Sequence, residues 1–333
     1  MPETTQVSVL IPLYRGRNTI KACLESLVQQ KDVGIEILLL DNGCPEKTGQ
    51  WAGFHLAQQP NVRWKLLEEP RNIGFARAMN RMYAESSAPW ILFLNQDVTL
   101  EPDHIVNLVS AMERHPDWGG VCGILFRSGE GNENVIDTTG HVIFRDRIVR
   151  SRGAGKNLSG ESFPEGEVFG ISAACALYRR AALEASREKE GPFDPDFFSY
   201  FEDIDQDYRM HRAGWKLGFT PSATGRHTLA GSGGRRELQI RISAYGNRTR
   251  ILWKHESAAS LLPDLGPVMM QDIFGSLRAL VTDPVSWLVG PWLFIRTIPS
   301  VLARRARMTE KWGSDMSWLR AWLLSERDRW QDR

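Results

Sequence analysis

Short apolar runs alternate with amphipathic segments over the first 126 residues of the chain. Apolar runs rich in β-branched residues predict strands, and they lie at residues 7–11, 35–40, 62–67, 90–94 and 119–126. Helical segments are predicted between them, near residues 20–28, 48–58, 75–83 and 105–112. Because the strands lack a two-residue alternation, helices should cover both faces of the sheet. The pattern predicts a doubly wound α/β fold with a mostly parallel central sheet.

The second half of the chain changes character twice. Residues 128–170 are Gly-rich and polar with short strand-like pieces such as 141–144, which predicts a long excursion over one sheet edge. Residues 216–220 predict a strand and 221–235 a Gly/Ser-rich loop, in which 231–234 is only a weak phosphate-binding signal. From about residue 237 the chain is helical and holds half or more of its 12 tryptophans. A helical C-terminal extension is therefore expected.

Composition excludes several classes of protein. The 41 Lys and Arg against 40 Asp and Glu give a net charge of +1, so no nucleic-acid partner is expected. The four cysteines are scattered, which predicts neither a disulfide framework nor a zinc site and favours a reducing cytosol. The start of the chain lacks the features of a secretory signal. The uncharged run 284–295 is too short to cross a membrane, so no spanning segment is predicted.

Polar residues follow three of the predicted strands, at 12–15, 41–43 and 95–97. In an open parallel sheet, ligands bind beyond the carboxyl ends of the strands. Residues 71–74 bring a cation, an amide and a glycine to a helix N-terminus, where anions are favoured. Each motif alone is also compatible with an ordinary turn, but all of them share one sheet edge. The absence of G-x-G-x-x-G and P-loop patterns disfavours a dehydrogenase or a kinase.

The densest group of carboxylates lies at residues 202–207. Acidic residues in the first turn of a helix are explained by the helix dipole alone. The apolar flank 197–201 favours chemistry as well, because apolar walls raise the pKa of a carboxyl group and exclude water, as a general base requires. His227 is either structural or, with Asp97, a ligand of Mg²⁺ or Mn²⁺ whose shell diphosphate oxygens complete.

Taken together, these motifs resemble the family 2 inverting glycosyltransferases of GT-A fold, in particular their bacterial rhamnosyltransferase-like branch. The resemblance covers about residues 7–255. It rests on the order and spacing of segments 7–14, 37–43, 72–80, 93–97, 176–183, 193–205 and 226–227. The implied fold is a GT-A type, Rossmann-like sheet flanked by helices. The implied domains are a nucleotide-sugar-binding and catalytic domain at 1–255 and a helical region at 256–333.

The resemblance also implies residue roles. Donor-binding residues are expected at Pro12, Tyr14, Arg15, Asp41, Arg71, Asn72, Gly74, Asn80, Asn95 and Gln96. Asp97 matches the metal-binding aspartate of the D-x-D motif, with His227 as second ligand, and Asp203 matches the general base of the E-D motif that begins at Glu202. The first acid of D-x-D is replaced by Asn95, which leaves one strong carboxylate for a divalent metal, Mg²⁺ or Mn²⁺.

The implied activity is metal-dependent inverting transfer of a single sugar, such as rhamnose from a dTDP-linked or UDP-linked donor, to a lipid-linked or cell-surface polysaccharide acceptor. The segment 206–210 lacks the Trp of the processive Q-x-x-R-W motif, which argues for one addition per encounter. Aromatic and basic residues at 283–310 predict either an interfacial element for the cytoplasmic face of the membrane or a core or homodimer-packing helix pair. The alternatives are a sugar nucleotidyltransferase and a catalytically silent scaffold.

Overall fold

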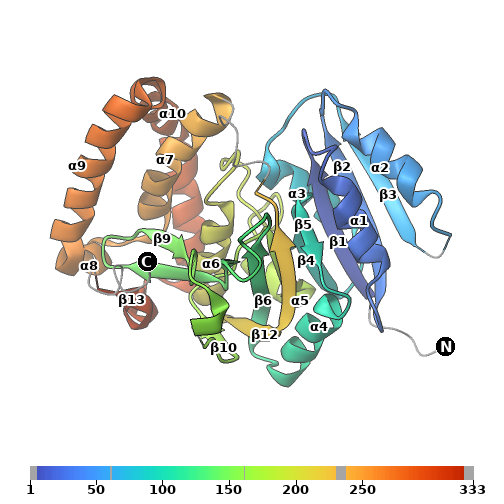
Figure 1. The fold of residues 1–333 in the computed structure, drawn as a ribbon. Coiled ribbons are helices and arrows are strands. Elements are labelled where there is room, and N and C mark those ends of the chain that lie inside the picture. The colour runs from blue at the N-terminus through green and yellow to red at the C-terminus, as the bar shows by residue number, and fades with distance from the viewer. Residues whose placement is uncertain (1–5, 61, 161, 230–237, 326–333) are drawn as a thin grey trace.

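A central sheet carries the fold of the computed structural model, which describes residues 6–60, 62–160, 162–229 and 238–325 (Figure 1). The predicted loop segment 231–234 lies outside these ranges. The sheet order is β10-β12-β6-β11-β4-β1-β2-β3, with β5 and β7 joined to β12 and β6. Its strands are β1 (Gln6–Leu13), β2 (Gly34–Asn42), β3 (Arg63–Glu69), β4 (Trp90–Leu94), β5 (Val98–Leu100), β6 (Trp118–Arg127), β7 (Ile136–Thr138), β10 (Gly166–Val168), β11 (Cys175–Arg179) and β12 (Lys216–His227).

Parallel pairing dominates this sheet, and the predicted fold class is confirmed. Strand β1 pairs in parallel with β2 and β4, β2 pairs in parallel with β3, and β12 pairs in parallel with β6. Strand β11 runs antiparallel to both of its neighbours, β4 and β6. The helices of this half are α1 (Ile20–Val28), α2 (Thr48–Leu56), α3 (Phe75–Glu85), α4 (His104–Arg114), α5 (Arg180–Ser186) and α6 (Glu202–Arg212).

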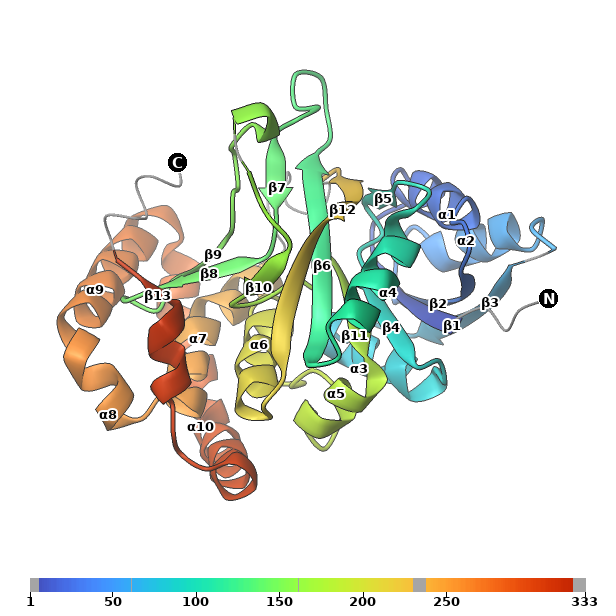
Figure 2. The same ribbon diagram turned by 90° about the horizontal axis from the view of Figure 1, so that it is seen from below.

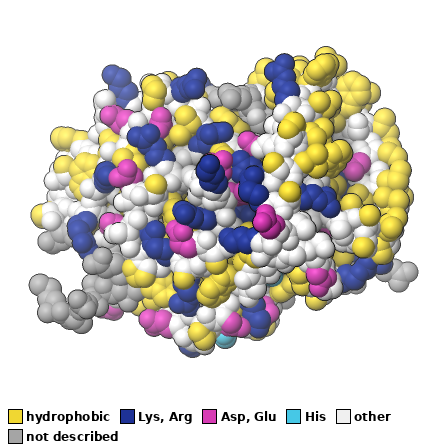
Figure 3. Space-filling model, turned by 180° about the vertical axis from the view of Figure 1, so that it is seen from behind, with side chains coloured by type: hydrophobic (Ala, Val, Ile, Leu, Met, Phe, Trp, Pro, Cys, Tyr) yellow, Lys and Arg dark blue, Asp and Glu magenta, His cyan; other side chains and the backbone are white. Residues whose placement is uncertain are grey.

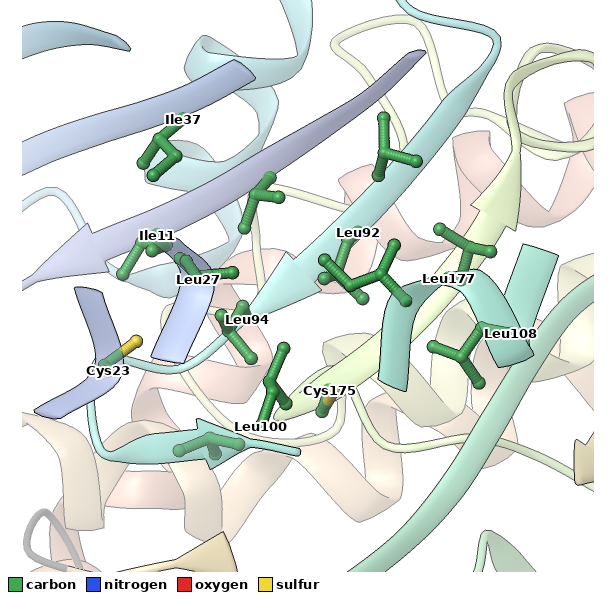
Figure 4. Packing of buried hydrophobic residues seen from close by; sticks show 14 of the residues in the cluster. Ile11, Cys23, Leu27, Ile37, Leu92, Leu94, Leu100, Leu108, Cys175 and Leu177 are labelled. Carbon is green, nitrogen blue, oxygen red and sulfur yellow. The ribbon is translucent and has the colours of Figure 1, made fainter. Parts of the chain in front are cut away.

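Apolar side chains fill both sides of the sheet, as expected of strands that lack alternation. On one side, Ile11 and Leu92 pack with Leu27 of α1 and Leu108 of α4 (Figure 4). A second cluster on the other side includes Met79 of α3 and side chains from α5 and α6. Burying one such side chain contributes about 1.5–3 kcal/mol. The two cores hold the strand ends, and so the polar residues that follow them, in fixed positions.

Strand β12 is longer than its sequence predicts, because the segment 221–227 is a strand and not a loop. The register against β6 shifts between Phe219 and Thr224, and Pro221 lies within this irregularity. Proline cannot donate a ladder hydrogen bond, so a bulge is where a strand tolerates it. The extension carries His227 to the end of the sheet, where it pairs with Val98 of β5.

The remaining helices gather at the end of the molecule away from β3 (Figures 1 and 2). They are α7 (Leu238–His255), α8 (Ala258–Leu261), α9 (Leu265–Thr282) and α10 (Pro284–Trp312). A small sheet of β13 (Leu323–Leu324), β8 (His141–Phe144) and β9 (Val149–Ser151) links the end of the chain to the excursion. Three 3-10 turns complete the described part, at Leu158–Gly160, Leu262–Asp264 and Ser317–Trp322.

Helix α10 is longer than the uncharged run that the sequence presents. Its 29 residues make it, among the described residues, the helix long and apolar enough to cross a membrane by length and composition alone. The sequence-based expectation of no spanning segment counted only residues 284–295. The helix continues past Arg296, because a single charge does not end a helix.

Candidate active site

A cavity of about 560 Å³ opens at the carboxyl ends of β1 and β4. Predicted site residues line it from the β1–α1 turn, the β4–β5 turn, the start of α3, the start of α6 and the end of β12. They are Pro12, Tyr14, Arg15, Asn72, Gly74, Asn95, Gln96, Asp97, Glu202, Asp203 and His227. Segments more than 200 residues apart in the sequence thus form one cavity. This is the sheet edge at which ligands of open α/β folds bind.

Gln96 fixes the turn that follows β1. Its side-chain amide donates to the Tyr14 carbonyl at 2.6 Å, and its Oε1 accepts from the Tyr14 N–H at 3.1 Å. A Cβ at Gly16 would lie 2.1 Å from the Gln96 amide, so a side chain there would push this amide out of place. Gln96 therefore sets the shape of one cavity wall.

The N-terminus of α3 forms a second wall. Oδ1 of Asn42 accepts from the Ile73 N–H at 2.9 Å, and Oδ1 of Asn72 accepts from the Gly74 N–H at 2.8 Å. Gly74 has φ +87°, and a Cβ there would lie 2.4 Å from the Phe198 carbonyl oxygen. The helix N-terminus, which favours anions, therefore faces the cavity beside asparagine side chains.

Three predicted donor-binding residues do not line the cavity. Both oxygens of Asp41 accept backbone hydrogen bonds, from Cys44 at 2.7 Å and Gly49 at 2.8 Å, so this carboxylate holds the β2–α2 loop. Asn80 is buried and clamps the backbone of Phe193 through bonds of 2.7 and 2.9 Å. Its place in α3 is structural. Arg71 is exposed ahead of α3, outside the lining.

Asp97 and His227 meet at the end of β12. Nε2 of His227 lies 3.3 Å from Oδ1 of Asp97, and the Nδ1–H of His227 donates to Oδ2 of Asp137 at 2.8 Å. Burial opposes the charge on His227, but hydrogen bonds and the charges of Asp137 and Asp97 prevail and raise the pKa of His227 to about 9. A metal ion would have to displace the proton that the imidazole carries at neutral pH.

This arrangement fits a divalent ion that the protein holds through two ligands. With Nδ1 bonded to Asp137, Nε2 of His227 is directed at the Asp97 carboxylate, and carboxylate-bonded imidazole is the usual arrangement of metal-binding histidines. No group of three or more His, Cys, Asp or Glu that could hold a metal occurs among the described residues. Any bound ion would therefore depend on oxygen ligands from the substrate and from water.

The turn before α6 holds an unusual backbone. Tyr200 and Phe201 have φ values of 69° and 74°, in the left-handed region that non-glycine residues rarely adopt. Such strain costs about 1–3 kcal/mol per residue and persists only where the surrounding structure enforces it. The helix begins directly afterwards at Glu202, so this turn presents Glu202 and Asp203 to the cavity.

The two carboxyl groups differ in environment. Glu202 is 6% exposed, and its Oε2 has no hydrogen-bond partner within the described ranges. Burial, and then the charge of Asp203, raises the pKa of Glu202 well above its usual range, which keeps this carboxyl neutral. The Asp203 side chain is 18% exposed, and its Oδ2 accepts from the Ala173 N–H at 3.4 Å. Of the two, Asp203 is the one suited to accept a proton.

Sequence reasoning missed three polar residues of this region. Asp137 orients His227, and His141 and Asp207 lie behind Asp203. The first two come from the Gly-rich excursion, where no periodicity or motif distinguishes them from loop residues. In the sequence, Asp207 is one member of the acidic cluster 202–207. Its role depends on its partner His141, which comes from a distant segment of the chain.

The family model described as "Glycosyl transferase family 2" matches residues 8–187, which is more than half of the chain. The chain is 29% identical over 252 residues to an N-acetylglucosaminyl-diphospho-decaprenol L-rhamnosyltransferase of Mycobacterium tuberculosis, covering 70% of this chain and 79% of that protein. It is 25% identical over 318 residues to an N-acetylglucosaminyltransferase of Sinorhizobium fredii, covering 89% and 71% of the two chains.

Solved structures share the fold. The mannosyltransferase PcManGT from Pyrobaculum calidifontis, in complex with GDP-Man and Mn²⁺, matches with a TM-score of 0.52 at 15% identity, covering 95% of this chain and 85% of that one. TarS 1–349 of S. aureus, in complex with UDP-GlcNAc, matches with a TM-score of 0.57 at 14% identity, covering 94% and 88%. At these identities the likeness shows a GT-A type fold.

Proposed function

Because this chain belongs to glycosyl transferase family 2, we propose that it transfers a single sugar, with inversion, from a nucleoside-diphosphate sugar to a hydroxyl of a lipid-linked or cell-surface polysaccharide acceptor. The donor we propose is dTDP-rhamnose. The similarity to the N-acetylglucosaminyl-diphospho-decaprenol L-rhamnosyltransferase of M. tuberculosis supports rhamnose as the transferred sugar and a lipid-linked diphosphate sugar as the acceptor class. We assign donor binding and catalysis to residues 1–255.

One observation carries the proposal. The Asp97–His227 pair and the Asp203 carboxylate line the same cavity, from the end of the sheet and from the start of α6. An inverting transfer needs one carboxylate near the acceptor and a separate site for the diphosphate. We assign the donor to the walls formed by Tyr14, Gln96 and the N-terminus of α3.

The chemistry follows from these assignments. Asp203 accepts the proton of the acceptor hydroxyl while the oxygen forms a bond to the anomeric carbon. The bond from that carbon to the diphosphate breaks, and its electron pair leaves with the diphosphate. Asp97 and His227 would hold a Mg²⁺ or Mn²⁺ ion, which when bound offsets the negative charge of the leaving group. Glu202, as a neutral carboxyl, donates a hydrogen bond to substrate.

Asp97→Ala tests the donor site. A nucleotide at about 100 times its Kd stabilises a protein by about 2.7 kcal/mol, which is roughly 5 °C in Tm for a chain of this size. We expect dTDP or dTDP-rhamnose with Mn²⁺ to raise the Tm of the wild type by this amount, and the shift to disappear in Asp97→Ala. Asp103→Ala is the control, since Asp103 is exposed and pairs with exposed Lys31 at 3.6 Å, away from the cavity lining.

The outcomes separate the candidate functions. A shift confined to UDP compounds would replace the proposed dTDP donor but keep the transferase. A shift of equal size without metal would contradict the assigned roles of Asp97 and His227. No shift with any nucleoside diphosphate or nucleotide sugar, with or without acceptor lipid, would favour the catalytically silent scaffold.

Helices α9 and α10 support a membrane-surface location. Large apolar side chains on them are more than half exposed, among them Met270, Ile273, Phe274, Leu277, Leu288 and Trp292. Figure 3 shows hydrophobic side chains gathered along this side of the molecule, at its right and upper right. Exposed Arg278 and Arg296 lie on the same two helices. An apolar, aromatic face with arginines fits the surface of an anionic bilayer.

We propose that α10 lies on the membrane and does not cross it. Arg304, in the second half of the helix, is buried and pairs with Glu188 at 3.2 Å and Asp194 at 3.3 Å in the catalytic body. Withdrawing the helix into lipid would leave these carboxylates without that partner. We therefore assign residues 256–333 to peripheral docking at the cytoplasmic face of the membrane.

Substituting the apolar face should release the protein from vesicles. For Phe274→Ser combined with Trp292→Ser, we expect binding to phosphatidylglycerol vesicles in a sedimentation assay to fall by about 100-fold, at about 1.4 kcal/mol per side chain. Phe54→Ser is the matched control, because Phe54 is 71% exposed on α2 of the catalytic body. If the wild type does not bind vesicles and is dimeric in solution, this face would instead pack against a second copy of the chain.

A further inference from the structure

A buried histidine and a buried aspartate lie directly behind Asp203. The Nδ1–H of His141, on β8, donates to Oδ2 of Asp207, on α6, at 2.8 Å. Nε2 of His141 lies 3.9 Å from Oδ2 of Asp203. His141 is 6% exposed and Asp207 fully buried. The imidazole therefore bridges two carboxylates that are one helical turn apart.

The backbone around this group is shaped to hold it. The His141 N–H donates to the Gly170 carbonyl at 2.7 Å, and the Ile171 N–H donates to Oδ1 of Asp207 at 3.0 Å. A Cβ at Gly170 would lie 1.9 Å from Oδ2 of Asp207 and 2.9 Å from Nδ1 of His141. Only a glycine leaves room for this pair. Three separate segments of the chain thus fix the imidazole behind Asp203.

We propose that His141, held by Asp207, is a positioning residue for Asp203: its imidazolium pairs with the Asp203 carboxylate and holds it oriented beside the cavity. The inference rests on the proposed function, since it requires Asp203 to accept the acceptor proton. His141 itself transfers no proton. It stays charged while Asp203 takes the proton from the acceptor hydroxyl, so that the cation stabilises the base before the transfer.

The charges around His141 support its cationic form. Burial opposes that charge, but the carboxylates of Asp207 and Asp203 prevail and raise the pKa of His141. Burial raises the pKa of Asp207 to about 7, and the charge of His141 works against this rise. The Tyr178 phenol and the Cys122 thiol, which also lie near Asp207, stay neutral, since burial raises the pKa of the Tyr178 phenol and raises that of the Cys122 thiol to about 12.

The sign of the pH dependence follows. Because the pKa of His141 is raised in the folded protein, its cation is fully present below the ordinary histidine range and is lost as the pH rises through the raised value. The cationic support for Asp203 is therefore present at low pH and is lost as the pH rises through that raised value.

Two variants test the proposal through the pH profile of kcat/KM. For His141→Asn, we expect kcat to fall by about 10–100-fold, as for groups that orient metal ligands, with the donor KM unchanged and the alkaline limb lost. For Asp207→Asn, which keeps a hydrogen-bond acceptor but loses the charge, we expect the alkaline limb to move to lower pH. Profiles that keep the wild-type limbs in both variants would overturn the proposal.

A matched control separates positioning from folding. His104, on α4, is also a buried histidine, and its ring bonds to the carbonyl of Thr224 on β12 at 2.8 Å, not to Asp203 or Asp207. His104→Asn should lower the Tm without moving either limb. Equal changes of the profile in His104→Asn and His141→Asn would assign His141 a purely structural role.

A second readout needs no substrate. NMR titration of protein with ¹³C-labelled histidine, assigned with His141→Asn, should show an imidazolium at pH 7 whose midpoint falls in Asp203→Asn. The inference would be overturned if His141 were neutral at pH 7, or if the midpoint of its titration were unchanged in Asp203→Asn. This result differs from failure of the proposed function. If Asp203 were not the base, Asp203→Asn would retain transfer, while the titration of His141 would still respond to Asp203→Asn.

Discussion

Replacing Asp203 with Asn is expected to reduce sugar transfer by about 10²–10⁴-fold, the range that general-base catalysis contributes. The change keeps the size of the side chain and the contact with the Ala173 N–H, but the amide cannot accept the acceptor proton. Because Asp203 lies at the start of α6, apart from Asp97 and His227, the Kd for the donor should stay within about 2-fold of that of the wild type. Initial rates with saturating donor, together with donor affinity, check this result.

Glu202→Gln is the matched control. Burial and the charge of Asp203 keep Glu202 neutral, so an amide preserves its charge as well as its size. We expect this variant to keep transfer within about 10-fold of the wild type, because the amide N–H can still donate and at most about one hydrogen bond changes. Greater loss in Glu202→Gln than in Asp203→Asn would exchange the roles of the two residues. Equal loss of donor affinity in Asp203→Asn and Asp97→Ala would contradict the separation of base and donor site.

Replacing Lys254 with Met is expected to destabilise the protein by about 3–5 kcal/mol, the cost of removing one partner of a buried ion pair. Lys254 is fully buried on α7, and its Nζ lies 2.7 Å from Asp194, 2.7 Å from Asp205 and 2.8 Å from Glu188. Burial opposes its charge, but these three carboxylates prevail and raise its pKa. Urea-induced unfolding measures the loss.

Lys216→Met provides the comparison for this variant. Lys216 also pairs with carboxylates, Asp117 at 2.9 Å and Glu167 at 2.7 Å, but its side chain is 48% exposed. Water replaces the lost partner of an exposed pair, so no measurable change in unfolding is expected. If both lysine variants unfolded alike, the buried network would not be what holds α7 against α6 and the segment before it.

The positions of the strand-end motifs could be predicted from local sequence, but the roles of their side chains could not. Asn95, Gln96 and Asp97 follow a short apolar strand, and their place at the sheet edge depends only on the strand pattern and the parallel direction of the sheet. The cavity lining confirms that they lie together. Asp41 follows a strand by the same rule, yet its carboxylate is taken by two backbone N–H groups. Sequence spacing does not distinguish a turn-forming carboxylate from one that faces a ligand.

His227 shows the opposite case. Its sequence neighbours predict a loop, but pairing of β12 with β6 and β5 extends the strand to this residue. Backbone pairing with residues 100 or more positions away then brings it to Asp97 and Asp137. That pairing depends on long-range contacts, which local composition does not contain.

Local sequence accounts for the alternating α/β order, the mostly parallel sheet and the edge at which a site forms, because apolar periodicity and strand-end chemistry are local properties. The roles of the acidic residues of α6 depend on the folded chain. Asp203 faces the cavity, Asp205 bonds to Lys254 and Arg209, and Asp207 bonds to His141. A helix turns about 100° per residue, so acids two positions apart point in different directions, and the partners they meet come from distant segments of the chain.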